Sequence, residues 1–211
     1  MMVLYIDTTS SYLYAAIEKN NEIIDQVKEE LEHNLSEKAL PKIVEMFNRN
    51  DIQPKLIEKI IVVNGPGSFT GIRIGVTIAK VYAWSQNIPI TEILSLQAMN
   101  LSSNSNCYHV PVINARREKV FAAIYDINNQ EVLKPQHISI KDLEKKLEKL
   151  PSYTIITNDE INITGCKEKY DPNLKKIIET YKYKESINPH AINPEYLKLT
   201  EAEENKNDNR V

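Results

Sequence analysis

This chain of 211 residues has few cysteines, no net positive charge and no long apolar runs. Its two cysteines, Cys107 and Cys166, stand far apart and outside any CxxC spacing, which favours a reducing compartment over a disulfide framework. No window approaches the roughly 18 apolar residues of a membrane span, and no basic, cleavable segment opens the chain. We therefore expect a soluble, cytoplasmic protein. With 26 Lys and Arg against 29 Asp and Glu, the chain lacks the basic balance of a protein that binds nucleic acid unaided.

Histidine is also too scattered to suggest a metal site. The chain has four histidines, and no two of them stand at i and i+4, the spacing at which two imidazoles share one face of a helix. No Ser/His/Asp or Cys/His arrangement emerges from the spacing either. We therefore predict no metal and no catalytic residue of the chain's own.

The order of strand-like and helix-like segments predicts two α/β halves. The first half reads as a strand over 2–6, a hairpin over 12–30 turning at Asn20 and Asn21, and an amphipathic helix from Asn34 that contains Pro41. A buried strand over 59–63, a second helix to about Gln86, a strand over 88–94 and a short helix over 95–101 follow. The polar run 102–106 indicates a boundary, so we predict an N-terminal lobe over 1–103 and a C-terminal lobe over 104–211 with a polar tail.

Four of the five glycines lie within a single stretch, 65–75. A Walker loop would need Lys after its last glycine, where this chain has Ile72, and a dinucleotide fingerprint would need a glycine at Thr70. Both fail. What remains is a structural turn before a helix, with a hydroxyl at Ser68 or Thr70 suited to cap that helix. The residues of this turn are Gly65, Pro66, Gly67, Ser68 and Thr70.

Small residues recur at every fourth position of the following helix, at Gly71, Gly75, Ala79 and Ala83. A glycine inside a helix costs about 1 kcal/mol relative to alanine, so this stripe indicates close approach of another backbone. The approaching chain is either this protein's own sheet or a partner, and an anion held at the helix N-terminus is a third reading.

Several motifs resemble the TsaB (YeaZ-type) family of the bacterial tRNA threonylcarbamoyladenosine machinery. They are "IDTTS", "HNLSEKALPKI", "GPGSFTGIRIGVTIAKVYA" and "IPITEILSLQAM" in the first half, with "INARREKVFAAIY" and "NPEYLK" more faintly in the second. Asn114 stands where the family usually has aspartate. The resemblance implies a two-lobed α/β fold of the actin, Hsp70 and sugar-kinase superfamily, in which each lobe is a mixed sheet with helices and "NPEYLK" forms a closing strand.

The family also implies a function as a non-catalytic subunit. Its first two helices pair with those of a TsaD-like catalytic subunit, or with a second copy when TsaD is absent. A TsaE-like ATPase docks on the complex, ATP and metal belong to the partner subunits, and tRNA is contacted only through the complex. By this resemblance the predicted partner-binding residues are Leu35, Ala39, Ile43, Phe47, Gly71, Arg73, Gly75, Ala79 and Ala83.

Two departures bear on the rival reading, a self-standing enzyme such as a small-molecule kinase or a metallopeptidase. Ser95 and Met99 stand where the catalytic TsaD paralogue carries its metal-binding histidines. In ATP-using members of the superfamily, a glycine-containing turn follows the first aspartate, whereas Asp7 is here followed by Thr8 and Thr9. Asp7, Thr8 and Thr9 are thus candidates either for residual nucleotide binding or for capping the hairpin.

Overall fold

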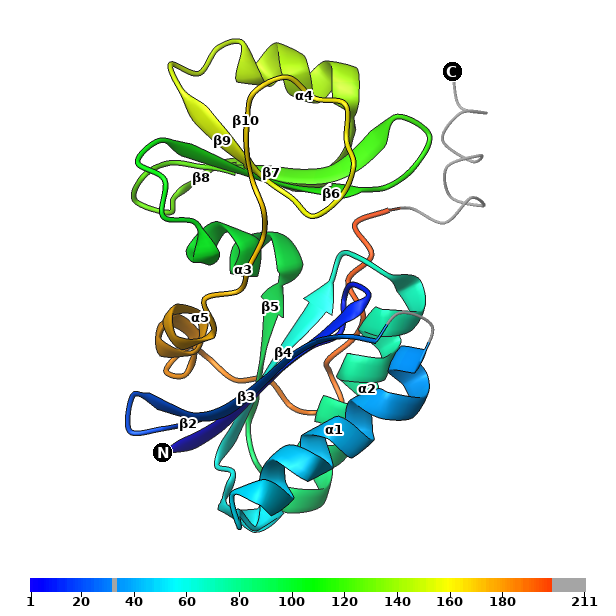
Figure 1. The fold of residues 1–211 in the computed structure, drawn as a ribbon, viewed down its shortest axis with the longest axis vertical. Coiled ribbons are helices and arrows are strands. Elements are labelled where there is room, and N and C mark those ends of the chain that lie inside the picture. Colours follow the sequence, from blue (N-terminus) through cyan, green and yellow to red (C-terminus); the bar gives the residue numbers. More distant parts are fainter. Residues whose placement is uncertain (32–33, 199–211) are drawn as a thin grey trace.

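The computed structural model describes residues 1–31 and 34–198, which form two lobes stacked along the long axis of the molecule (Figure 1). The N-lobe contains a five-stranded sheet in the order β3-β2-β1-β4-β5. β1 pairs antiparallel with β2 and parallel with β4, and β4 pairs parallel with β5. The five strands are β1 (Met2–Asp7), β2 (Tyr12–Lys19), β3 (Glu22–Glu30), β4 (Lys59–Gly65) and β5 (Ile90–Leu94).

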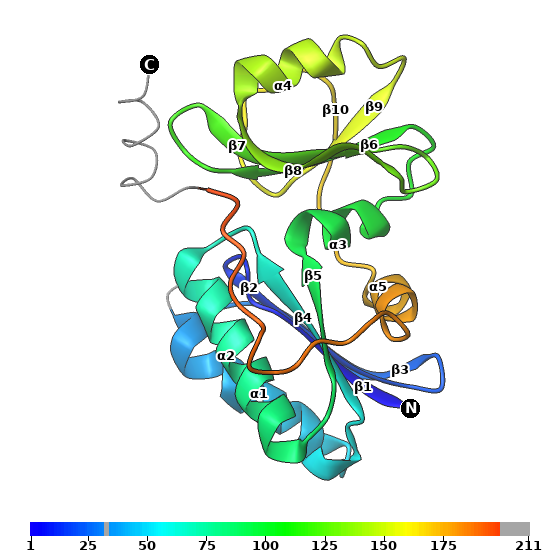
Figure 2. The same ribbon diagram turned by 180° about the vertical axis from the view of Figure 1, so that it is seen from behind.

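Helices cover both faces of the N-lobe sheet. On one face α1 (Leu35–Arg49) and α2 (Phe69–Gln86) lie side by side, and α1 continues through Pro41 (Figures 1 and 2). On the other face α5 (Leu174–Tyr181) packs its buried leucine and isoleucines against β1, β2 and β4. The short 3₁₀ helix η2 (Pro54–Leu56) precedes β4. The alternation of apolar residues explains this double cover, because successive strand side chains point to opposite faces.

The C-lobe is a second five-stranded sheet in the order β10-β9-β6-β7-β8. Its outer face is covered by α4 (Ile140–Leu147), which Ser139 caps by accepting a hydrogen bond from the Asp142 amide. Its inner face packs on α3 (Ser95–Ser102), which also contacts the N-lobe sheet. The strands are β6 (Tyr108–Asn114), β7 (Lys119–Tyr125), β8 (Glu131–Ser139), β9 (Tyr153–Ile156) and β10 (Cys166–Glu168).

The predicted C-terminal lobe over 104–211 needs a correction, because the chain returns to the N-lobe after β10. Helix α5 and the extended segment 182–198, which we call the strap, both pack there. Ile192 of the strap is fully buried in the N-lobe core, and its carbonyl oxygen accepts a hydrogen bond from Lys80 on α2. The chain passes between the lobes twice, once after α3 and once after β10. These two segments are adjacent, since Ser103 donates a hydrogen bond to Glu168 over 2.6 Å. The C-lobe is therefore an insertion between residues 103 and 169.

The strap itself was predicted to end in a strand at "NPEYLK", and this too is wrong. Residues 193–198 belong to neither sheet, although the Glu195 amide donates to the carbonyl oxygen of Asn64 at the end of β4. His33 and the polar tail lie outside the described residues. Within the described ranges, none of the helices is both long and apolar enough to cross a bilayer.

Candidate functional site

All four glycines of the 65–75 stretch lie where this chain's own backbone or side chains come close. A Cβ atom at Gly65 would collide with the carbonyl oxygen of Glu195, and one at Gly67 with that of Thr9. Both glycines also have positive φ angles, 124° and 158°. At Gly71 a Cβ atom would meet the Thr8 carbonyl oxygen, and at Gly75 the Thr8 hydroxyl. The glycines therefore allow β4, the β1–β2 turn and the strap to pack together.

The turn that precedes α2 is fixed by hydrogen bonds within the chain. The Ser68 amide donates to the Thr9 carbonyl over 2.7 Å, and the Ser68 hydroxyl accepts from the Gly71 amide, which confirms the predicted N-cap. Thr70 occupies the first turn of α2 and has no capping role. The carbonyl oxygen of Pro66 accepts a hydrogen bond from the Ser95 hydroxyl. These contacts support the reading of the segment as a structural turn.

Asp7, Thr8 and Thr9 also bond within the chain. The Asp7 carboxylate accepts hydrogen bonds from the Thr9 amide over 2.8 Å and the Thr9 hydroxyl over 2.7 Å, which is the capping arrangement that we had kept open. The Thr8 hydroxyl donates to the Gly71 carbonyl over 2.7 Å. Burial raises the pKa of Asp7 to about 6, against the lowering effect of the Thr9 hydrogen bonds. A nucleotide-binding role for the three residues stays a prediction.

A cleft of about 810 Å³ lies between the lobes. Its N-lobe wall comes from the β1–β2 turn and the start of α2, and its C-lobe wall from β6, β7 and the loop after β9. Ser95 and Met99 line the cleft, and each exposes only 4% of its surface. Tyr170 is partly buried at the cleft with its hydroxyl inaccessible to solvent, and desolvation and nearby Asp7 raise the pKa of that hydroxyl.

The histidines that the structure describes lie apart from one another. His109 is buried, and its ring bonds with Asn100 over 2.8 Å and the Ser105 carbonyl over 3.0 Å. His190 meets the edge of Trp84, and His137 lies against Phe121. Across residues 1–31 and 34–198, no three His, Cys, Asp or Glu side chains form a group that could hold a metal ion.

Asn114 uses its amide as part of a tight turn. Its Oδ1 atom accepts a hydrogen bond from the Arg116 amide over 2.8 Å, and the three residues from Arg116 to Glu118 all have positive φ angles. An aspartate could accept the same bond, so the exchange to asparagine preserves this turn. Arg116 lines the cleft.

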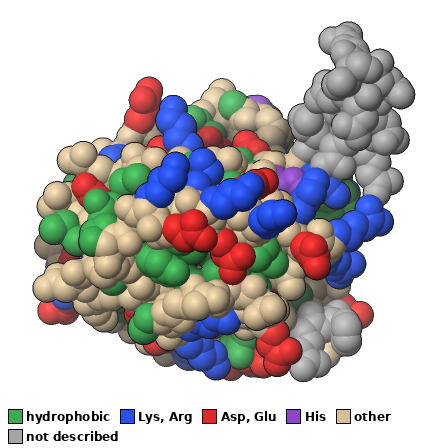
Figure 3. All heavy atoms as spheres, turned by 90° about the horizontal axis from the view of Figure 1, so that it is seen from above, with side chains coloured by type: hydrophobic (Ala, Val, Ile, Leu, Met, Phe, Trp, Pro, Cys, Tyr) green, Lys and Arg blue, Asp and Glu red, His purple; other side chains and the backbone are tan. Residues whose placement is uncertain are grey.

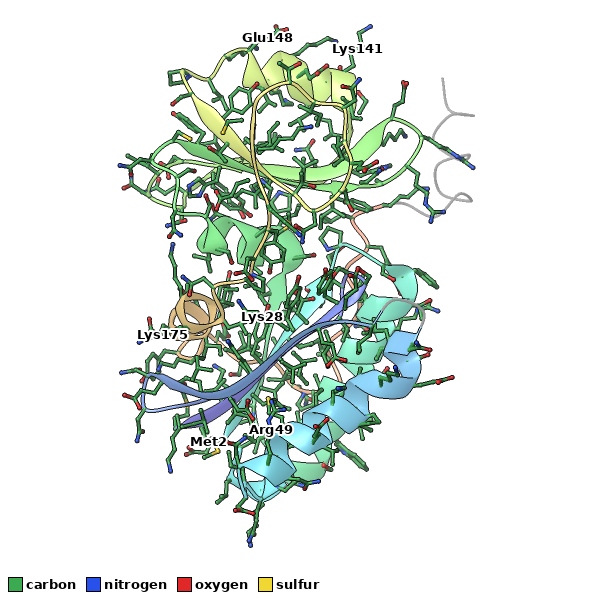
Figure 4. The ribbon with its side chains drawn as sticks, viewed as in Figure 1. Met2, Lys28, Arg49, Lys141, Glu148 and Lys175 are labelled. Carbon is green, nitrogen blue, oxygen red and sulfur yellow. The ribbon has the colours of Figure 1, made fainter. Side chains whose placement is uncertain are left out.

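The charged helix α4 lies at the far end of the C-lobe. Figure 3 looks onto this end and shows Lys and Arg side chains in a row with Asp and Glu among them. Lys141 and Glu148 point away from the molecule (Figure 4), and Lys145 forms an ion pair with Asp142. This mixture of signs is typical of a solvated helix face.

Most of the predicted partner-binding residues face inward, which corrects our reading of the small-residue stripe. Arg73 is exposed, whereas the other eight are buried within the N-lobe core. Of the interpretations of the stripe, packing against the chain's own residues is therefore the correct one, as the close approach of Thr8 to Gly75 shows. The eight are Leu35, Ala39, Ile43, Phe47, Gly71, Gly75, Ala79 and Ala83.

The same two helices nevertheless present apolar side chains to solvent. Five large side chains there are about half exposed or more: Leu40 (50%), Val44 (47%), Phe69 (55%), Val81 (56%) and Trp84 (62%). A groove of about 440 Å³ between α1 and α2 includes Leu40, Phe69 and Arg73. We call the five exposed apolar residues, together with Arg73, the α1/α2 outer face. The helical spacing of Leu40 with Val44, and of Val81 with Trp84, is the sequence signal that identifies it.

Comparison with known proteins shows the family to which the sequence is related. The family model described as "TsaD: tRNA N6-adenosine threonylcarbamoyltransferase" matches residues 12–204. A relative from Bacillus subtilis, "tRNA threonylcarbamoyladenosine biosynthesis protein TsaB", is 30% identical over 96% of both chains. A protein with the same name from Buchnera aphidicola subsp. Acyrthosiphon pisum is 27% identical over 84% of this chain and 86% of its own.

Solved structures confirm the two-lobed fold. A Pseudomonas aeruginosa protein with similarity to the peptidase YEAZ superposes with a TM-score of 0.77 at 14% identity, over 93% of this chain and 99% of that one. A second structure, YeaZ from the same organism, gives a TM-score of 0.73 at 15% identity, over 93% of this chain and 99% of that one. At 14% and 15% identity these two structures support only the fold. Membership of the family rests on the sequence matches. The chain belongs to the TsaD threonylcarbamoyltransferase family and is a TsaB/YeaZ-type member of it.

Proposed function

We propose that this chain is a non-catalytic scaffold and dimerisation subunit for the formation of N6-threonylcarbamoyladenosine in tRNA. It binds a TsaD-type catalytic subunit through the α1/α2 outer face, and a second copy of itself when that subunit is absent. A TsaE-type ATPase docks on the resulting complex. Metal and ATP are held by the partner subunits, and tRNA meets this chain only within the complex. The family match and the names of the relatives support the pathway.

The observation that carries the proposal is the apolar outer face. Exposed aromatic and aliphatic side chains gathered on neighbouring helices are typical of a helix-packing interface. Trp84 is the largest of them and exposes 62% of its surface. A tryptophan buried at the centre of an interface commonly carries a large share of the binding free energy.

The turn and the cleft favour this reading over a self-standing kinase or metallopeptidase. The glycines that would let a phosphate approach are instead in contact with the chain's own Thr8, Thr9 and Glu195. The Ser95 hydroxyl is engaged by Pro66, so the position that carries a metal ligand in the paralogue serves the turn here. Transfer of the threonylcarbamoyl group by the purified chain alone, or turnover of ATP by it, would support the rival instead.

Two matched variants test the docking surface. Val81 on α2 and Val132 on β8 are almost equally exposed, at 56% and 53%. Val81→Ser should weaken binding of the TsaD-type subunit measured by calorimetry, whereas Val132→Ser should leave it unchanged. Trp84→Ala should weaken it more, by about tenfold or greater, which corresponds to about 1.4 kcal/mol. Wild-type affinity for both α2 variants would show that the partner binds elsewhere.

A further inference from the structure

Arg73 is held in one place by residues from two distant parts of the chain. Its Nε donates a hydrogen bond to the Tyr196 hydroxyl over 2.8 Å, and its guanidinium carbon lies 3.7 Å from the centroid of the Phe69 ring. The rings of Phe69 and Tyr196 stack on each other, with centroids 5.1 Å apart and an interplanar angle of 25°. An exposed arginine on a helix would otherwise sample many rotamers.

The held guanidinium keeps most of its hydrogen-bonding capacity free. Only Nε is used, and among the described residues neither Nη atom of Arg73 has a hydrogen-bond or ion-pair partner. Arg73 lines the groove of the α1/α2 outer face together with Leu40 and Ile78. A planar, fixed pair of donors beside apolar side chains matches a carboxylate, which accepts two parallel N–H bonds.

The position of Tyr196 is set by the strap, which the N-lobe holds mainly through its backbone. Lys80 on α2 donates to the carbonyl oxygens of His190 and Ile192, over 3.1 and 3.2 Å. One residue before Tyr196, the Glu195 amide donates to Asn64 over 2.7 Å. The strap thus runs beside α2 (Figure 2). Tyr196 reaches the first turn of α2, where its ring stacks on Phe69.

We propose that Tyr196 is a positioning residue, which holds Arg73 ready to bind a carboxylate of the TsaD-type partner. The inference rests on the proposed function and extends it in two ways. It names the acidic chemistry of the partner at this point, and it makes the C-terminal strap part of the recognition surface. Ordering of Arg73 before the encounter lowers the entropic cost of binding.

A double-mutant cycle tests whether Tyr196 acts through Arg73. Affinity for the TsaD-type subunit is measured for Arg73→Ala, Tyr196→Ala and the double variant. Each single change should weaken binding by roughly five- to twentyfold, and Tyr196→Ala should have no further effect once Arg73 is absent. Arg73→Lys, which keeps the charge and loses the planar fork, should behave like Arg73→Ala. Tyr196→Phe keeps the stack and should be milder than Tyr196→Ala.

Controls separate this inference from the proposed function. Tyr183→Ala removes an exposed tyrosine earlier in the strap and should leave affinity unchanged. Additive effects in the cycle, or wild-type affinity for both Tyr196 variants, would overturn the positioning role. If Trp84→Ala weakens binding while the Arg73 and Tyr196 variants do not, only this inference fails. If Trp84→Ala also binds normally, the docking surface itself is wrong. Circular dichroism and melting curves identify any variant that fails to fold.

Discussion

Asp7 keeps an ionisable carboxyl at the end of β1 with only 2% of its surface exposed. Burial raises its pKa to about 6 from an ordinary value of 3.8. Between these two values the folded chain keeps a proton that the unfolded chain releases. The stability contributed by that proton is complete below pH 3.8 and is lost as the pH rises through 6.

Asp7→Asn should therefore stabilise the protein at neutral pH. The asparagine keeps an oxygen that can accept both Thr9 hydrogen bonds and removes the buried charge. Two pKa units correspond to about 3 kcal/mol, so the free energy of unfolding of the variant should exceed that of the wild type by up to this amount at pH 7. Denaturant unfolding measured at several values between pH 4 and 7 checks it. If the free energy of unfolding depended on pH in the same way for the wild type and for Asp7→Asn, the prediction would be contradicted.

Asp7→Asn also tests whether Asp7 takes part in nucleotide binding. Because Asp7 is engaged by Thr9 and nearly inaccessible, a reconstituted modification system containing Asp7→Asn should turn over at the wild-type rate. Quantification of threonylcarbamoyladenosine in tRNA, with all subunits present, is the measurement. A marked loss of turnover with complex assembly intact would assign Asp7 a direct role in nucleotide binding.

Local patterns are sufficient to predict most of the helices and strands. The Asn20–Asn21 turn and the cap of α2 are both decided by residues within a few positions of each other, so the sequence predicts them. The direction in which the small-residue stripe faces depends on Thr8, which lies more than sixty positions from Gly75. Nothing local reveals that contact. Helix α5 was missed although Leu174, Ile177 and Ile178 stand at helical spacing. What the local pattern does not reveal is that these residues pack on β1, β2 and β4.

The α2 stripe yields a test at the scale of a whole element. Gly75→Leu should lower the free energy of unfolding by about 1–3 kcal/mol, because the new side chain overlaps Thr8 in a packed core. The folded fraction should bind the TsaD-type subunit with wild-type affinity. Thermal melting and calorimetry on the same sample provide both values.

Alanine at the same position provides the control. Gly75→Ala gains about 1 kcal/mol of helix propensity and still meets the Thr8 hydroxyl, so in a Thr8→Ala background it should be less destabilising or even favourable. A Gly75→Leu variant with an unchanged melting temperature and lost partner binding would restore the reading that the stripe faces another chain.

The whole molecule divides differently from the two halves of its sequence. A fragment over 1–103 lacks α5 and the strap, so the apolar face formed by Val3, Tyr5 and Ile61 would be uncovered. We expect it to be unfolded or aggregated, as judged by circular dichroism and size exclusion. Joining Ser103 to Lys169 with a short Gly-Ser linker, through to residue 198, should restore cooperative unfolding, because these crossings are adjacent. A cooperatively folded 1–103 fragment would contradict this division.

The way in which the strap is held has a consequence for its evolution. Lys59 donates to the carbonyl oxygen of Lys184 over 2.8 Å, Lys80 donates to those of His190 and Ile192, and Asn64 to that of Asn193 over 3.3 Å. Every residue type supplies a carbonyl oxygen, so the strap's side chains at Lys184 and Asn193 are free to drift while its course is kept, whereas the buried side chain of Ile192 is fixed by the core. Selection would act instead on Lys59, Lys80 and Asn64 of the N-lobe. Related proteins could therefore keep the course of the strap while the residues at its backbone anchor points change.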